Sequence, residues 1–216
     1  MKLVVFGANG ATGKWLVRLA VERGHRVTAV MREGVRALVP QGADVVRGDP
    51  LDAAFVDMAV TGKDAVVTAL GVRLRRGRNP FSSLVSPPTL LSQSAAHMLA
   101  AMKRHGVSRI SVVSAAGVGD SWKTVAWPLR VVFRISNIQV GYEDHERAEA
   151  LLAASGLDWQ AVRPTTLTNG ESTGTRHVHR YATTMRIARE DLARFMLDQI
   201  EQPRFDERTP MISGAV

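Results

Sequence analysis

The sequence predicts an α/β fold, a doubly wound parallel sheet with a small C-terminal elaboration. Two observations predict it. Short apolar runs alternate with longer amphipathic ones along the 216 residues, as strands and crossover helices do in a parallel sheet. The first apolar run, residues 2–7, leads directly into a glycine-rich turn and then a helix. A chain of this length can bury most of its surface in one domain, so we expect residues 1–216 to form a single unit.

Turn residues separate the expected elements. Arg23-Gly24, His105-Gly106 and Ser155-Gly156 each place a glycine where helices commonly end. The expected strands are 2–7, 26–31, 43–47, 64–70, 108–114, 158–163 and, more weakly, 208–213; the expected helices are 11–23, 51–60, 87–105, 143–155 and 190–201. Right-handed crossovers between such strands place a ligand crevice at their carboxyl ends.

The glycine-rich turn reads Gly7-Ala-Asn9-Gly10-Ala11-Thr12-Gly13. In a Rossmann fold the first glycine of such a turn allows the tight bend, the second lets backbone approach a pyrophosphate, and the third lets helix and strand pack closely. The helix N-terminus adds unpaired N–H groups and a partial positive charge. The turn therefore predicts a dinucleotide-binding domain.

The end of the second strand indicates which dinucleotide is bound. An acidic residue there suits the ribose hydroxyl of NAD, and an arginine suits the 2′-phosphate of NADP. This strand ends in Arg32, with Arg36 nearby, and arginine makes paired charge-assisted hydrogen bonds to phosphate. Glu33 argues the other way but comes one residue late. We expect NADP(H) as the cofactor.

Other strand ends supply further candidate cofactor contacts. Asp49 and Pro50 follow the third strand, where a carboxylate can approach the adenine ring, and Leu70-Gly71 ends the fourth. Arg73 opens an arginine cluster that can hold the pyrophosphate or a flavin phosphate. Each of these positions also fits ordinary turn chemistry.

Composition narrows the classes of protein and partner. Cysteine is absent, which removes disulfides and thiol chemistry, and no apolar run reaches the roughly 20 residues that span a bilayer. No signal peptide is recognisable, so we expect a cytoplasmic protein without a membrane partner. The formal net charge is +8, but the arginines are mostly scattered and no reading helix is evident, which disfavours nucleic acid. A homodimer is left open.

Two stretches interrupt the alternation and follow strand ends, so both can overhang the crevice: residues 72–90 and 117–142. The second carries several bulky side chains without a clear period, among them Trp122, Trp127, Phe133 and Tyr142. They can line a substrate pocket, cover the core or form a subunit interface. We take Trp122 and Tyr142 as candidate substrate contacts.

The proton donor of typical short-chain dehydrogenases is absent. Those enzymes use a tyrosine with a lysine four residues later, whereas Tyr142 is followed at that spacing by Glu146 and Tyr181 by Met185. No lysine occurs after Lys123. His177 and His179 lack a clear carboxylate partner, so no metal site is expected.

The remaining polar candidates lie where strands end or helices begin. Ser114 ends the fifth strand, and Thr166 follows the sixth. His145 lies in Tyr142-Glu-Asp-His-Glu146, which we expect to open a helix; it can donate a proton near neutral pH, or it is a solvent-exposed residue of a helix N-terminus.

Several motifs together resemble one family. They are the glycine turn, the strand ending in Arg32, Arg47-Gly-Asp49, Thr61-Gly-Lys-Asp-Ala-Val-Val67, Ala101-Met-Lys-Arg-His-Gly-Val107, Glu143-Asp-His145, Ser155-Gly-Leu-Asp-Trp159, Val162-Arg-Pro164 and Ile187-Ala-Arg-Glu-Asp-Leu192. They are similar to the atypical short-chain dehydrogenases, specifically the NADPH-dependent flavin reductase and biliverdin reductase B group with its NmrA-like relatives. The resemblance covers essentially the whole chain.

The resemblance implies a site. Reduced nicotinamide would lie over Ser114 near Pro164, His145 would take the family's active-site histidine position, and the acceptor would be a planar conjugated molecule such as a flavin. A second histidine of biliverdin reductase B is replaced here by Thr166, which disfavours tetrapyrrole reduction. The missing dyad fits flavin chemistry, because solvent can supply the remaining proton.

Three functions are compatible with these residues. The first is an NADPH-dependent oxidoreductase acting on a flavin, a quinone or a similar acceptor. The second is an NADP(H)-binding redox sensor without turnover, motivated by the lack of a strong acid. The third is a reductase or isomerase of a secondary metabolite, for which residues 117–142 would build a larger pocket.

Overall fold

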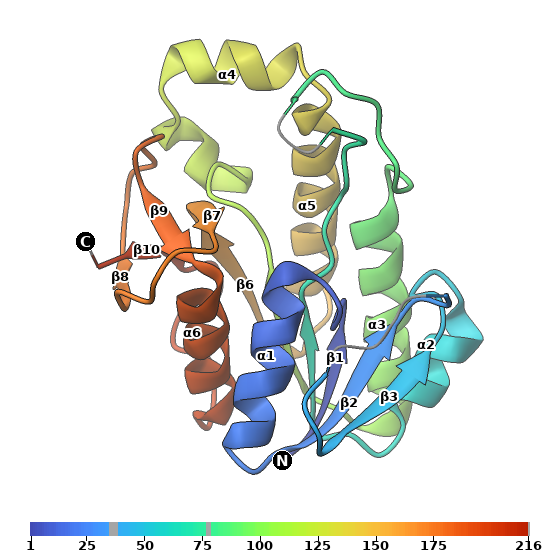
Figure 1. Ribbon diagram of the computed structural model, residues 1–216. Helices are drawn as coiled ribbons and strands as arrows, with labels where there is room; N and C mark the ends of the chain where they lie inside the picture. The colour runs from blue at the N-terminus through green and yellow to red at the C-terminus, as the bar shows by residue number, and fades with distance from the viewer. Residues whose placement is uncertain (35–38, 77–78, 216) are drawn as a thin grey trace.

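The computed structural model describes residues 1–34, 39–76 and 79–215 (Figure 1). The elements follow in the order β1 (Lys2–Phe6), α1 (Ala11–Glu22), β2 (Arg26–Met31), β3 (Ala43–Arg47), α2 (Ala53–Val60), β4 (Ala65–Thr68), α3 (Leu90–His105), β5 (Arg109–Val113), the 3-10 helix η1 (Gly119–Thr124), α4 (Trp127–Arg134), α5 (Ile138–Ala153), β6 (Asp158–Pro164), β7 (Thr166–Thr168), β8 (Thr175–His177), β9 (Arg186–Ala188), α6 (Arg189–Glu201) and β10 (Met211–Gly214).

The main sheet confirms the predicted doubly wound fold. Its strand order is β3-β2-β1-β4-β5-β6-β10-β8, with parallel pairing from β3 through β10 and an antiparallel β8 at the edge. Strand β1 pairs with both β2 and β4, so the chain reverses its direction of winding there. A crevice at the carboxyl ends of the strands follows from this reversal.

Two apolar layers hold the sheet between helices. Leu3 and Val5 of β1 face a core shared with α1 and α6, whereas Val4 and Phe6 face a core shared with α2, α3 and α5. This alternation is the two-residue period of a strand that is buried on both faces. The helices on the two sides can be followed in Figure 1.

Residues 117–142 and the helix that follows them differ from the expected secondary structure. The helix expected at 143–155 begins at Ile138, so Tyr142 and His145 lie inside α5 and do not open it. Asn137 anchors its start through tertiary contacts: its backbone N–H donates to Pro80 O at 2.9 Å and its side-chain amide to Ser82 O at 3.0 Å. The preceding residues form η1 and α4, two helices that the sequence pattern did not indicate.

The C-terminal elaboration is a small parallel sheet. Strands β7 and β9 pair with each other beside the carboxyl ends of the main strands, and β9 runs directly into α6. Asp191 on α6 fixes the connecting loop, because its carboxylate accepts the Thr173 N–H at 2.9 Å and the Ser172 hydroxyl. The three short strands β7 to β9 were not expected.

Candidate functional site: a dinucleotide crevice with an adjoining aromatic pocket

The glycine turn is packed too tightly for side chains. Gly7 has a φ of +77°, and a Cβ built on it would lie 2.8 Å from Ala69 O at the end of β4. A Cβ on Gly13 would lie 2.1 Å from Gly7 O, inside any allowed contact. The glycines therefore allow the turn to pass against β4 and let α1 pack on the turn.

The N-terminus of α1 is open to a ligand. Gly10 is its N-cap and supplies no side-chain hydrogen bond, and the first turn, which includes Ala11, Thr12 and Gly13, holds no acidic residue. Within the described chain, Asn9 Oδ1 is buried and has no hydrogen-bond partner. An uncapped helix N-terminus offers N–H donors and a partial positive charge to the pyrophosphate of a dinucleotide. Asn9 Oδ1 is an acceptor, so it fits a hydroxyl or N–H donor of the ligand and not the pyrophosphate.

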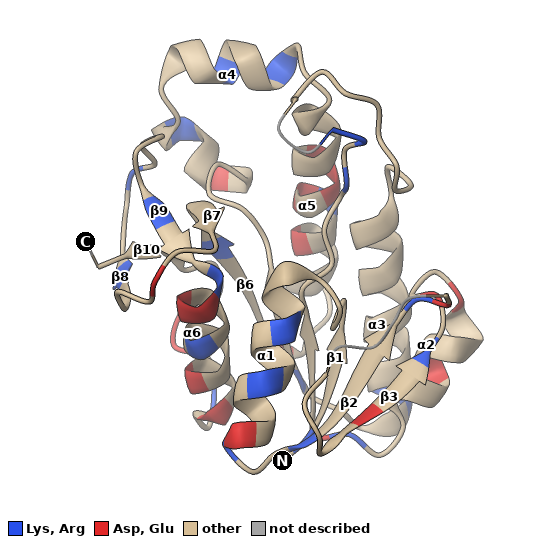
Figure 2. Cartoon of the chain, in the orientation of Figure 1, with Lys and Arg blue, Asp and Glu red and all other residues tan. Residues whose placement is uncertain are grey.

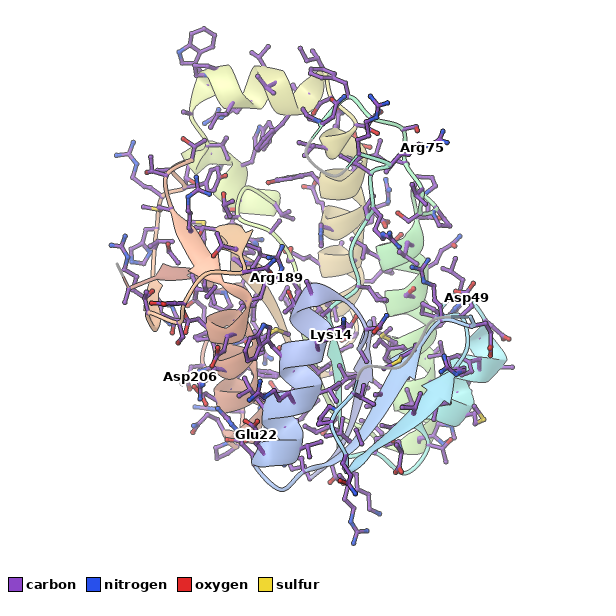
Figure 3. The ribbon with its side chains drawn as sticks, viewed as in Figure 1. Lys14, Glu22, Asp49, Arg75, Arg189 and Asp206 are labelled. Atoms are coloured by element: carbon purple, nitrogen blue, oxygen red, sulfur yellow. The ribbon has the colours of Figure 1, made fainter. Side chains whose placement is uncertain are left out.

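Arg32 and Asp49, the predicted polar residues after β2 and β3 that the structure describes, lie on the surface. Arg32 is exposed directly after β2, and Arg36 lies outside the described residues. Asp49 is exposed after β3 and accepts the Leu51 N–H at 2.9 Å, so its carboxylate also stabilises the turn. Pro50 is buried, and its carbonyl is 3.3 Å from His97 Nδ1. Figure 3 labels Asp49 and, on α1, Lys14.

The end of β4 leads into an arm that folds back on itself. Gly71 is exposed and has open space where a Cβ would be. Arg73 is exposed, and its N–H donates to Ser86 Oγ at 2.9 Å, while Leu74 and Leu84 form an antiparallel bridge. Leu70 turns inward and lines a cavity.

Ser114 is the first member of a buried polar chain at the end of β5. Its hydroxyl donates to Glu149 Oε1 at 2.6 Å. The same carboxylate receives Arg163 Nη2 at 2.6 Å and Nε at 3.1 Å. Arg163 also pairs with Asp120 of η1, whose side chain is exposed. The hydrogen bond from Arg163 and its charge lower the pKa of Asp120.

This chain fixes the direction of the Ser114 hydroxyl. A hydroxyl has one hydrogen and two acceptor lone pairs, and here the hydrogen points at Glu149. The hydroxyl oxygen of Ser114 can therefore accept a hydrogen bond from a group in the crevice. Gly119 packs closely on the ion pair of Glu149 and Arg163, since a Cβ there would lie 2.8 Å from Arg163 Nη2.

His145 lines a small inner cavity between the sheet, α3 and α5. The cavity measures about 30 Å³ and is also lined by Ser114, Glu149, Thr68 and Ser94. Burial lowers the pKa of His145 to about 4, against the charges of Glu149 and Asp144, which raise it. The ring is neutral at pH 7, so it is a poor general acid there.

An outer pocket of about 200 Å³ lies on the adjoining face of α5. Trp122, Phe133 and Tyr142 contribute its aromatic wall, with ring centroids 5.1 to 6.5 Å apart. Tyr142 donates its hydroxyl to Ala116 O at 3.0 Å, and burial raises its pKa. Tyr142 is therefore a neutral pocket wall at pH 7. Glu143, Glu146, Gln139 and Arg134 supply polar groups.

The remaining predicted residues do not share this pocket. Thr166 lies on β7, 3.5 Å from the hydroxyl of Tyr181, and is not among the described residues that line either of the two cavities. Pro164 is buried at the end of β6, where its carbonyl accepts the Ala116 N–H. Trp127, which the sequence left between pocket, core and interface, is 75% exposed on α4.

Sequence reasoning assigned no role to Glu149 or Arg163. A signal was present in the sequence. Arg163 lies in the apolar second half of β6, and a buried arginine needs a carboxylate partner. Its partner could not be identified, since Glu149 lies on another element. Within the described residues, no group of three or more potential metal ligands occurs, and none of the helices found there could cross a membrane.

Known proteins match this chain over most of its length. An uncharacterized Mycobacterium tuberculosis protein, Rv2047c, is 30% identical over 163 residues, 76% of this chain; the match spans only 14% of that protein. YhfK of Bacillus subtilis, described as an uncharacterized sugar epimerase, is 27% identical over 219 residues, covering 96% of this chain and 92% of YhfK.

Among solved structures, ChuY, an anaerobillin reductase from Escherichia coli O157:H7, superposes with a TM-score of 0.79 at 22% identity, covering 98% of this chain and 96% of ChuY. That likeness confirms the fold. The family model described as NAD(P)H-binding matches residues 7–203, which include the glycine turn, the polar chain at Ser114 and both cavities. The crevice thus has both the geometry and the sequence of a nicotinamide dinucleotide site, and the chain belongs to the NAD(P)H-binding family.

Proposed function

We propose that the chain is an NADPH-dependent reductase that passes hydride to a planar conjugated acceptor, such as a flavin or a quinone, in the outer pocket. The observation that carries the proposal is the aromatic wall of Trp122, Phe133 and Tyr142, which adjoins the strand end that presents Ser114. Aromatic faces stack on flat rings and hold them in a defined orientation. When bound, NADPH supplies the hydride.

In this proposal the residues of the chain bind the cofactor and the acceptor and orient them towards each other. Ser114 accepts a hydrogen bond from the cofactor side, because its own hydrogen is held by Glu149. Arg32 binds the 2′-phosphate and thereby favours NADPH over NADH. His145 and Tyr142 stay neutral at pH 7. Solvent supplies the proton, and the positioning of cofactor and acceptor accelerates the hydride transfer.

ChuY supports reduction by a nicotinamide, whereas YhfK does not, and the two relatives give no common substrate. ChuY is an anaerobillin reductase, and YhfK is described as a sugar epimerase. Glu143 and Glu146 line the outer pocket together with a single arginine, Arg134. Two carboxylates and one arginine repel an acceptor that itself carries several carboxylates. The pocket therefore suits a flavin ring or a quinone better than a linear tetrapyrrole.

The test is oxidation of NADPH in the presence of FMN, riboflavin and a quinone, followed by the absorbance of the reduced nicotinamide. We expect turnover with at least one acceptor. Trp122→Ala should lower kcat/KM about tenfold through the lost stacking surface. Trp127→Ala removes an equal side chain outside the pocket and serves as the matched control. Equal losses in both variants would contradict the assignment of the pocket.

A redox sensor is the second candidate, favoured by one observation. At pH 7 His145 is a poor general acid, and the hydroxyl hydrogens of Tyr142 and Ser114 are already held by Ala116 O and Glu149. Tight NADPH binding without oxidation by any acceptor would select the sensor. A reductase or isomerase of a secondary metabolite would instead show turnover only with a narrow set of substrates.

A further inference from the structure

The positive charge of the chain is concentrated in two segments. Residues 72–89 and 121–142 contain seven lysines and arginines and no aspartate or glutamate, in a chain with a formal net charge of +8. The rest of the sequence is close to neutral. In Figure 2, α4 and the arm that follows β4 carry blue segments without red.

Among the described residues, the same segments expose most of the large apolar side chains that lie on the surface. Six of the ten exposed large hydrophobic residues found there belong to these segments. Trp127, Val131 and Ile135 recur every four residues along and just after α4 and are 75%, 48% and 66% exposed. Phe81 and Val85 of the arm are each 57% exposed. A helix in a globular protein normally turns such a stripe inward.

The two segments form one face. Asn137, just after α4, donates hydrogen bonds to the carbonyls of Pro80, Phe81 and Ser82 in the arm. Helix α4 lies across the end of the molecule beyond the carboxyl edges of the strands, and the arm rises beside it (Figure 1). Arg75 is labelled on that arm in Figure 3. We call the exposed residues of 72–76, 79–86 and 127–135 the basic apolar face.

We propose that the basic apolar face docks on the surface of an anionic lipid bilayer. Exposed tryptophan, phenylalanine and aliphatic side chains insert into the boundary between headgroups and acyl chains, and flanking arginines bind anionic headgroups. Arg75 and Arg76 are exposed, and within the described chain no acceptor binds either side chain. This proposal departs from the sequence-based expectation of no membrane partner.

Charge decides between a bilayer and other occupants. A second copy in a twofold dimer would bring the same arginines of both protomers together, which is repulsive. Nucleic acid would neutralise the arginines but leaves the aliphatic stripe of Val131 and Ile135 without a partner. An anionic bilayer satisfies both the arginines and the stripe.

The proposal is independent of the acceptor. Phe133 and Arg134 of α4 line the outer pocket, so docking would turn the pocket towards the lipid surface. Binding to vesicles requires neither NADPH nor turnover, and its failure is therefore distinguishable from failure of the proposed reductase.

The experiment is co-sedimentation of the full chain with vesicles of phosphatidylcholine alone and of phosphatidylcholine with phosphatidylglycerol. We expect binding only to the anionic vesicles, weakening as salt is raised. Arg75→Gln/Arg76→Gln should lower the partition coefficient about thirtyfold, at about fivefold per charge. Arg26→Gln/Arg204→Gln removes two exposed arginines elsewhere and should change it little.

The apolar contribution is tested by Trp127→Ser/Ile135→Ser, with Met58→Ser, an exposed methionine of α2, as control. We expect a loss of about tenfold or more for the double variant and a blue shift of tryptophan emission on vesicle binding that is reduced in it. Thermal melting confirms that each variant folds. Absence of binding to anionic vesicles, equal binding to neutral ones, or a dimer dispersed by the same double variant would each overturn the proposal.

Discussion

Backbone atoms form the phosphate-binding turn, whereas side chains form the outer pocket at the same edge of the sheet. At the turn, Gly7 and Gly13 leave no room for a Cβ where the backbone passes close to Ala69 and where α1 begins. In the pocket, Trp122, Phe133 and Tyr142 come from three different helices. We therefore expect the turn to bind a group common to all dinucleotides, and the pocket to differ from one relative to another.

The buried chain of Ser114, Glu149 and Arg163 adjoins the outer pocket at Gly119. It connects the end of β5 to α5 and β6 and reaches η1 through Asp120. We therefore expect a change in this chain to lower the stability of the fold and to disturb the outer pocket.

The largest effect is expected for Glu149→Ala. Removal of the carboxylate leaves Arg163 buried without its main partner, which costs about 3 to 5 kcal/mol of unfolding free energy. Denaturant unfolding measures it. Glu143→Ala, an exposed residue of the same helix, should change stability by less than about 0.5 kcal/mol. Equal stabilities of the two variants would show that the polar chain does not stabilise the fold.

A smaller loss is expected for Gly13→Ala. The new Cβ must displace Gly7 O, and such overpacking costs about 3 kcal/mol, or a fall in Tm of about 10 °C, together with loss of NADPH binding. Gly71→Ala meets open space and should leave Tm unchanged. Calorimetric melting and NADPH titration of both variants test how strictly the turn depends on its backbone.

His145 should give the inner cavity a dependence on pH. Its pKa is about 4 in the folded chain, against an ordinary value of 6.5 that the unfolded chain retains, so the unfolded chain binds more protons between these values. Stability then falls as the pH is lowered through that window, by about 2 kcal/mol between pH 7 and pH 5. His145→Gln should lose this component of the pH profile. An unchanged profile in the variant would assign the dependence to other groups.

The smallest effect is expected for Arg32→Ala. Loss of one exposed phosphate contact should weaken NADPH binding about tenfold and leave NADH binding unchanged. Arg26→Ala, an exposed arginine at the other end of β2, is the control. Comparable affinities of the wild-type chain for NADPH and NADH would refute the preference assigned to Arg32.

The two regions also differ in how far the sequence predicted them. The strands β1 to β6, the glycine turn and the doubly wound class follow from local patterns and were correctly expected. The start of α5 was placed five residues late, and α4 was missed. The apolar residues Trp127, Val131 and Ile135 along and just after α4 face outward, so no stripe turned towards a core marked them as a helix.

The sequence by itself determined the turn and the family, because a phosphate-binding turn is made by consecutive residues whose backbone is limited by sterics. Only the tertiary structure decided the partners of Ser114 and the members of the outer pocket. Glu149 lies 35 residues from Ser114 along the chain, and Arg163 lies 14 residues beyond Glu149. Which distant side chains meet depends on how whole helices pack on the sheet, and no local pattern encodes that packing.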